Sequence, residues 1–150
     1  GFRWPAQVTP FTAVIVVSDP KDPAKLDAAH AVWERIIAAA RSSDRSVRAV
    51  LEAVVAAHAQ GNEVAQLHEG VDEDEGWSSD QATEVVIDDR SATLGSKLAD
   101  SDLTGYAFRM IVGKHFSADG RVELQHCMGG EEGWQAVLLR VEAFGDAPAV

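Results

Sequence analysis

The sequence predicts an α/β domain with a mixed central sheet of about five strands flanked by helices. Two short, unbroken apolar runs, at 13–17 and 85–87, are rich in β-branched residues, as in strands that are covered on both faces. Apolar residues at helical spacing lie between these runs. The chain has 150 residues, 46% hydrophobic and 25% charged, which is typical of one globular domain with a sizeable core.

Apolar runs bounded by polar residues or glycine mark the strands. We expect strands at Ala13–Val17, Glu84–Ile87, Tyr106–Val112 and Val122–His126 to share one sheet, and a last strand at Trp134–Leu139 to follow. Charged residues come directly after the second of these runs. In open α/β sheets, ligands bind beyond the carboxyl ends of the strands, so this end of the sheet is the first place to look for a site.

Two helices follow from capping and periodicity. Asp22 is a suitable N-cap and Pro23 suits the first helical position, which predicts a helix from there to about Ala40. A short amphipathic helix is expected between Ser96 and Asp102. The buried face of the first helix should consist of six residues at helical spacing: Leu26, Ala29, Trp33, Ile36, Ile37 and Ala40.

A third helix is predicted near Ser46–Gln60, where Ser46 can act as the cap. Its apolar stripe consists of Val47, Val50, Leu51, Val54, Val55 and His58. The stripe either packs back on the domain or forms a docking face for another protein. Val71–Ser79 is acidic and contains glycine, so it is expected to be a loop.

The net charge of −11 is concentrated in one segment. Residues 61–80 hold seven acidic side chains and no Lys or Arg. Such a segment disfavours a phosphate backbone nearby, because nucleic-acid affinity depends largely on Lys and Arg. The longest apolar runs are too short to span a bilayer. The single cysteine, Cys127, excludes an internal disulfide.

Motifs for catalysis, cofactors or metals are missing from the sequence. His126 and Cys127 are adjacent rather than at ligand spacing, so neither a metal site nor a cofactor is predicted. No P-loop, Rossmann glycine motif or nucleophile elbow occurs. The carboxylate pairs Asp88/Asp89 and Asp100/Asp102 could serve acid–base chemistry or simply cap their loops. We therefore predict no catalytic residue, and whether the chain belongs to an enzyme stays open.

One stretch carries a family resemblance. It reads Asp88-Asp89-Arg90, then Gly95-Ser-Lys-Leu-Ala-Asp-Ser-Asp-Leu-Thr-Gly-Tyr-Ala107, then Val112-Gly113. A Trp4-Pro5 pair near the start fits the same pattern. The chain resembles the anticodon-binding domain of class II aminoacyl-tRNA synthetases, most closely the bacterial or organellar type of prolyl-tRNA synthetase. It departs from the family at Leu98, where a Phe is usual, and at Ala107, where a Pro is usual.

The resemblance implies that the chain recognises the anticodon of a prolyl-type tRNA through Asp89, Arg90, Lys97 and Asp100. Arg90 would contact phosphate or a guanine edge, and Lys97 would supply a mobile positive charge. Asp89 and Asp100 would accept hydrogen bonds from guanine N1 and N2.

Aromatic stacking would then come from Phe11, Tyr106 or Phe108 in place of the missing Phe. The structural alternative for Arg90 is a salt bridge to Asp88 or Asp102.

The resemblance also implies one domain over residues 1–150, with a peripheral insertion at 41–81 where the family has a short connection. The chain would be the non-catalytic, C-terminal part of a synthetase in the cytoplasm or in an organelle. The alternative is a repurposed synthetase-like domain that acts as a structural or protein-binding subunit of a larger assembly, for example in a mitochondrion. In that case protein partners would dock on the Val47–His58 helix.

Overall fold

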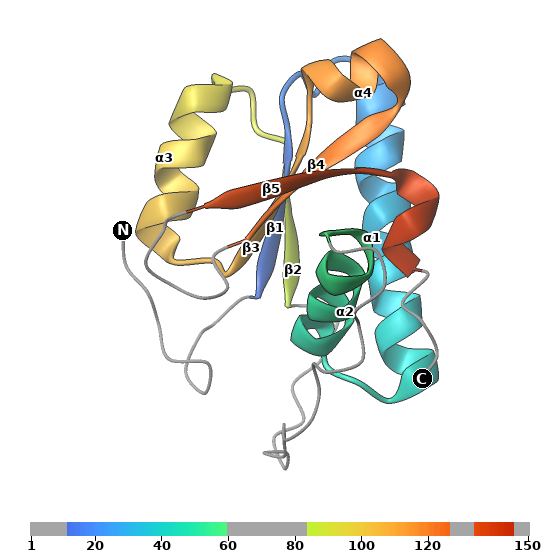
Figure 1. Ribbon diagram of the computed structural model, residues 1–150. Coiled ribbons are helices and arrows are strands. Elements are labelled where there is room, and N and C mark those ends of the chain that lie inside the picture. The colour runs from blue at the N-terminus through green and yellow to red at the C-terminus, as the bar shows by residue number, and fades with distance from the viewer. Residues whose placement is uncertain (1–11, 60–83, 127–133, 146–150) are drawn as a thin grey trace.

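Five strands form one sheet in the order β2-β1-β3-β4-β5 (Figure 1). The computed structural model describes residues 12–59, 84–126 and 134–145. The strands are β1 (Ala13–Val17), β2 (Val85–Asp88), β3 (Phe108–Val112), β4 (Arg121–His126) and β5 (Gln135–Arg140). β1 runs parallel to both β2 and β3, whereas β4 runs antiparallel to β3 and β5. The predicted mixed sheet is therefore confirmed, with strand ends shifted by one or two residues.

Helices cover both faces of this sheet (Figure 1). The helices are α1 (Pro23–Ser43), α2 (Val47–Ala59), α3 (Leu94–Thr104) and α4 (Lys114–Asp119), and a 3-10 helix η3 spans Val141–Gly145. Figure 1 shows α1, α2 and η3 on one face and α3 on the other, with α4 beyond the end of β3. No helix within the described ranges is both long and apolar enough to cross a membrane.

The alternation of side chains along each strand divides the sheet into two different faces. On β1, Ala13, Ile15 and Val17 belong to the main hydrophobic cluster with α1 and α2, so Val14 and Val16 point toward α3. The same alternation on β3 places Phe108 in the main cluster and turns Arg109 toward α3. The face under α3 therefore carries polar groups among its apolar ones.

The first helix starts as its sequence predicts. The Asp22 side chain accepts a hydrogen bond from the Ala24 backbone nitrogen at 3.0 Å, and Pro23 is the first helical residue. The helix continues past Ala40 to Ser43, and the C-cap residue Asp44 adopts φ 57° in the left-handed region. Four of the six residues expected on its buried face are fully buried, and Leu26 and Trp33 are partly buried.

The predicted third helix is confirmed as α2, and its surroundings decide between the two alternatives for its apolar stripe. Ser46 Oγ accepts a hydrogen bond from the Ala49 nitrogen at 3.1 Å and so caps the helix. α2 packs against α1, β5 and η3. The five apolar stripe residues are buried: Val47, Val50, Leu51, Val54 and Val55. The helix thus packs back on the domain, and its stripe is not free to dock another protein.

α2 lies in the helix layer on one face of the sheet, and its stripe belongs to the main hydrophobic cluster. That 41–81 is a peripheral insertion relative to the family stays a prediction. The acidic loop expected at Val71–Ser79 lies outside the described residues.

Candidate functional site

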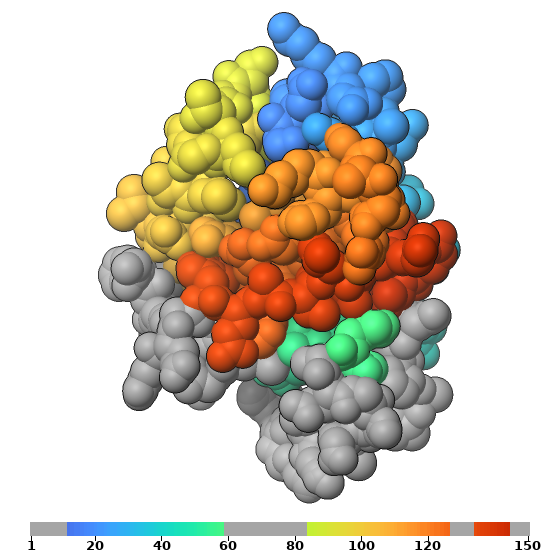
Figure 2. Space-filling view, turned by 45° about the horizontal axis from the view of Figure 1, so that its top comes forward, coloured from blue at the N-terminus to red at the C-terminus, as the bar shows by residue number. Residues whose placement is uncertain are grey.

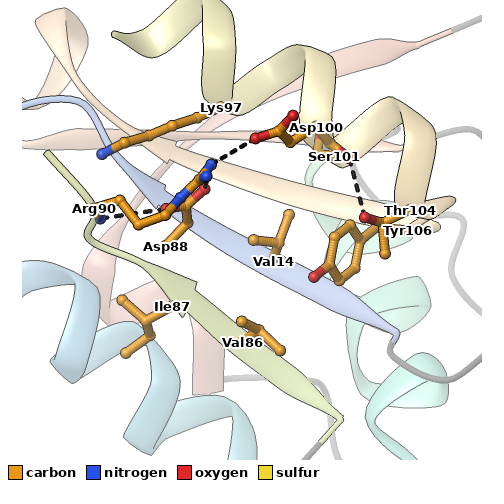
Figure 3. A pocket seen from close by; sticks show the side chains of 10 residues that line it. All are labelled: Val14, Val86, Ile87, Asp88, Arg90, Lys97, Asp100, Ser101, Thr104 and Tyr106. Carbon is orange, nitrogen blue, oxygen red and sulfur yellow. Dashed lines mark hydrogen bonds and ion pairs between the residues drawn. The ribbon is translucent and has the colours of Figure 1, made fainter. Parts of the chain in front are cut away.

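An open pocket of about 290 Å³ lies between α3 and the strands β1 and β2 (Figure 3). β2 ends at Asp88, and α3 begins after Thr93, whose Oγ1 accepts a hydrogen bond from the Ser96 nitrogen at 3.1 Å. The short connection therefore turns the chain from the carboxyl end of β2 directly over the sheet. The pocket is lined by Val14, Val86, Ile87, Asp88, Arg90, Lys97, Asp100, Ser101, Thr104 and Tyr106.

The carboxyl end of the parallel strands is also where several connections gather. Figure 2 shows the chain after β1 (blue), the segment from β2 into α3 (yellow) and α4 (orange) meeting at this end of the molecule. β1, β2 and β3 all run toward it, because they are parallel. The Arg90 end of the pocket thus lies at the carboxyl end of the strands, where open α/β sheets bind their ligands, and the pocket extends from there under α3 to Tyr106, which precedes β3.

The floor of the pocket is apolar. Val14 and Val86 lie on the pocket side of neighbouring strands, where they pair in register. Tyr106 lies beside them, at the opposite end of the pocket from Lys97 (Figure 3). Burial raises the pKa of the Tyr106 phenol, so the ring is neutral at physiological pH. An apolar surface with an aromatic side chain beside it suits a planar ring.

Arg90 dominates the rim of the pocket. Its Nε and Nη2 donate to the two carboxylate oxygens of Asp88 at 2.8 and 2.9 Å, and Nη2 also donates to Asp100 Oδ2 at 2.9 Å. The side-chain hydrogen bonds from Arg90 lower the pKa of Asp88, and the hydrogen bonds to Asp88 and Asp100 raise the pKa of Arg90. The Arg90 side chain remains 53% exposed, so a ligand can reach it.

The salt bridge weighed for Arg90 as a structural alternative is confirmed for Asp88 and wrong for Asp102. The Asp102 carboxylate instead accepts from Arg109 Nη1 at 3.1 Å. α3 directs Asp100, rather than Asp102, toward Arg90 (Figure 3). An ion pair and a recognition site are not exclusive here, because both Arg90 and Asp100 keep about half of their side-chain surface exposed.

Lys97 differs most from its expected role. The prediction of a mobile positive charge is wrong, because the Lys97 side chain is fully buried and its Nζ donates to the Val17 carbonyl oxygen at 2.7 Å. That carbonyl ends β1, so the ammonium ties α3 to the central part of the sheet. The charge of Lys97 also contributes to the lowered pKa of Asp88. Lys97 therefore affects the pocket as a buried side chain, through its bond to β1 and through its charge.

The structure gathers three of the four predicted site residues. Arg90, Lys97 and Asp100 line the pocket, whereas Asp89 is exposed and is not among the lining residues. Asp88 takes the inward position expected of Asp89. Period-two alternation along β2 could have shown this, because Asp88 shares the face of Val86.

Three aromatic residues are proposed to stack on a base, and among the described residues only Tyr106 lines the pocket. Phe108 is fully buried in the main hydrophobic cluster and cannot stack on a ligand. Phe11 lies outside the described ranges. Tyr106 lines the pocket and is only partly buried.

The charges that line the pocket balance, with Asp88 and Asp100 against Arg90 and Lys97. Such a site offers both hydrogen-bond donors and acceptors above an apolar floor, which suits the edge of a planar base better than a polyanion. Within the described part of the chain, no three His, Cys, Asp or Glu side chains gather as a possible metal site.

Comparisons with known proteins agree with this architecture. The family model described as "Anticodon binding domain" matches residues 53–144, which is more than half of the chain. The proline–tRNA ligase of Heliobacterium modesticaldum is 27% identical over 132 residues, covering 88% of this chain and 16% of that protein.

Shorter matches extend to other bacteria. The proline–tRNA ligase of Geobacter metallireducens is 48% identical over 48 residues, which is 32% of this chain and 8% of that protein. The proline–tRNA ligase of Aquifex aeolicus is 34% identical over 67 residues, which is 45% of this chain and 11% of that protein. The chain thus spans less than a fifth of the length of each of these relatives. The fold, the position of the pocket and the match over residues 53–144 together show that the chain belongs to the anticodon-binding domain family.

Proposed function

We propose that this chain is the anticodon-recognition domain of a proline–tRNA ligase, and that its pocket receives a base of the anticodon. The observation that carries the proposal is the pair of half-exposed side chains, Arg90 and Asp100, that face each other above an apolar floor. Proteins read single-stranded RNA loops through splayed bases that are stacked and hydrogen-bonded at their edges. The pocket offers both kinds of contact.

Each of the four predicted residues has a distinct part in this proposal. Arg90 donates to a phosphate or to a guanine edge, since its planar fork suits both. Asp100 accepts hydrogen bonds from guanine N1 and N2. Asp89 accepts bonds of the same kind if the RNA extends along the exposed rim of the pocket. Lys97 keeps α3 in place through the Val17 carbonyl, and Tyr106 supplies the stacking surface.

Two features limit the affinity that we expect. The carboxylates of Asp88 and Asp100 already accept some of the hydrogen bonds that the Arg90 guanidinium can donate. A ligand therefore has to replace or share these bonds. The acidic segment 61–80 repels RNA if it lies near the pocket. We therefore expect binding of an anticodon stem-loop at roughly micromolar affinity or weaker, as in salt-sensitive, mainly electrostatic complexes.

The experiment is a titration of a labelled stem-loop carrying a prolyl-type GG anticodon, at two salt concentrations. We expect Arg90→Ala to weaken binding, and deletion of residues 61–80 to strengthen it. Arg121→Ala is the matched control, because Arg121 is also exposed and paired with a carboxylate, that of Asp119, but does not line the pocket. It should leave the affinity unchanged.

Tight binding that is insensitive to Arg90→Ala would remove the proposed site. If neither the intact nor the shortened chain bound the stem-loop, the repurposed structural subunit would become the better interpretation. Under the present proposal the chain works wherever its tRNA is charged, in the cytoplasm or in an organelle. The aminoacylation reaction itself would require parts of the enzyme beyond these residues.

A further inference from the structure

The helix α3, which carries Asp100, is held to the sheet by polar contacts. Its two buried residues are Lys97 and Ser101. Neither supplies the apolar side chain that normally fixes an amphipathic helix to a sheet. Lys97 anchors one turn of α3 to β1, as described above. The anchor for the next turn is Arg109, which lies on β3 and points toward α3.

Arg109 is a nearly buried cation whose side chain is 8% exposed. Its Nη1 donates to Ser101 Oγ at 2.7 Å, to Asp102 Oδ1 at 3.1 Å and to the Leu98 carbonyl oxygen at 3.3 Å. All three acceptors belong to α3. A buried charge is tolerated only when it is paired and hydrogen-bonded, so these bonds strongly favour one position of the helix.

The remainder of the guanidinium connects the helix to one further strand and to the residue that precedes another. Arg109 Nε donates to Gln125 Oε1 of β4 at 2.6 Å. The guanidinium also lies over the Trp134 ring, 4.1 Å from its centroid, just before β5. Trp134 Nε1 donates in turn to Asp102 Oδ1 at 3.2 Å. Arg109 thus ties α3 to β4 and to the segment that leads into β5.

We propose that Arg109 is a positioning residue for the recognition pocket, which holds α3 so that Asp100 faces Arg90. Asp100 lies between the two anchored residues, Lys97 and Ser101, so the two anchors together set its distance from Arg90. Loss of the Arg109 anchor releases α3 while the main cluster on the opposite face of the sheet stays packed. The consequence for RNA rests on the proposed function, whereas the consequence for α3 does not.

The geometry requires arginine at this position. The bonds to β4 and to α3 come from different nitrogens of one rigid group. A lysine keeps the charge but offers a single nitrogen, which cannot reach both sets of acceptors at once. Arg109→Lys therefore separates the positioning role from the charge alone. Arg121→Lys is the matched control, because it makes the same change at an exposed position of β4.

The decisive measurement is amide hydrogen exchange of the protein without RNA. We expect Arg109→Lys to accelerate exchange in the second half of α3 by about tenfold, the factor for losing one charge-assisted hydrogen bond, with α1 and β1 unaffected. The Arg90 Nη2–H signals in NMR spectra should shift at the same time, since the Asp100 carboxylate that accepts from Nη2 moves. Unchanged exchange in α3, or equal acceleration in all elements, would overturn the proposal.

A milder variant covers the case in which Arg109→Lys does not fold. Asp102→Asn weakens the acceptor that Arg109 and Trp134 share, and the Asp102 side chain is 47% exposed, so the fold tolerates the change. We expect faster exchange in α3 in this variant as well. No change in α3 would contradict the proposal.

The effect of Arg109 on RNA binding is tested with a double-mutant cycle. Arg109→Lys should weaken stem-loop binding in the parent chain and add little once Asp100→Ala is present, because Arg109 acts on the RNA through the position of Asp100. Independent, multiplying effects would show that Arg109 acts elsewhere and would refute the role. If the parent chain bound no stem-loop, the proposed function would fail, and hydrogen exchange alone would decide the positioning of α3.

Discussion

Replacing Leu51 by alanine tests whether α2 belongs to the hydrophobic core. Leu51 is 0% exposed and lies in the main cluster. Removing buried methyl groups costs their transfer free energy and leaves a cavity, so Leu51→Ala should lower the free energy of unfolding by about 2–5 kcal/mol. For a domain of this size, a loss of about 3 kcal/mol lowers the melting temperature by roughly 6–12 °C.

The matched control is Leu103→Ala, because Leu103 also lies in a helix but is 72% exposed. It should change the stability by less than about 0.5 kcal/mol. Urea unfolding followed by circular dichroism measures both variants, and equal m-values would show that the same surface is exposed on unfolding. Equal stabilities of the two variants would refute the packing of α2 and restore the idea of a docking face.

Two further predictions concern one buried and one partly buried side chain that carry polar atoms. Burial lowers the pKa of His126 below 6.5, so the unfolded chain binds a proton at pH values where the folded chain does not. This contribution to stability is complete above the unfolded pKa of 6.5 and is lost progressively as the pH falls from there through the lowered folded pKa. Urea unfolding at about pH 7.5 and about pH 5.5 should therefore show a loss of stability that His126→Gln reduces. His30→Gln, at an exposed histidine, is the control and should not reduce this loss. Trp33 Nε1 donates to the Val85 carbonyl oxygen at 3.0 Å, so Trp33→Phe should cost about 1 kcal/mol in the same assay. A Trp33→Phe variant as stable as the parent would show that solvent replaces this bond without loss.

The elements were predictable where local chemistry decides them. The β-branched run of β1 and the Asp22–Pro23 start of α1 appear in the structure as the sequence indicates. The spacing of the apolar stripe defined α2, because 3.6-residue periodicity does not depend on the partner. Its burial could not be derived in the same way, since a stripe looks alike whether it faces its own core or another protein.

The site was harder to predict because its contacts join distant parts of the chain. Lysine is rarely buried, and nothing near Lys97 indicates an acceptor, since that acceptor is the carbonyl of Val17 on another element. The choice of Asp100 over Asp102 as the partner of Arg90 depends on where Arg109 lies under α3. Sequence motifs identified the loop correctly, but only the packing of α3 assigns each carboxylate to its cation.

The position of β1 in the centre of the sheet has a consequence for how the chain can be cut. Ala13 pairs with Val85 on one side and with Phe108 on the other, so β1 joins β2 to the rest of the sheet. The family match begins only at residue 53, after this strand. A fragment trimmed to the matched region would keep β3, β4 and β5 as an antiparallel unit and would leave β2 without the neighbour it has in the described sheet. The part of the sequence that the family model matches is therefore shorter than the part that is needed to complete the sheet.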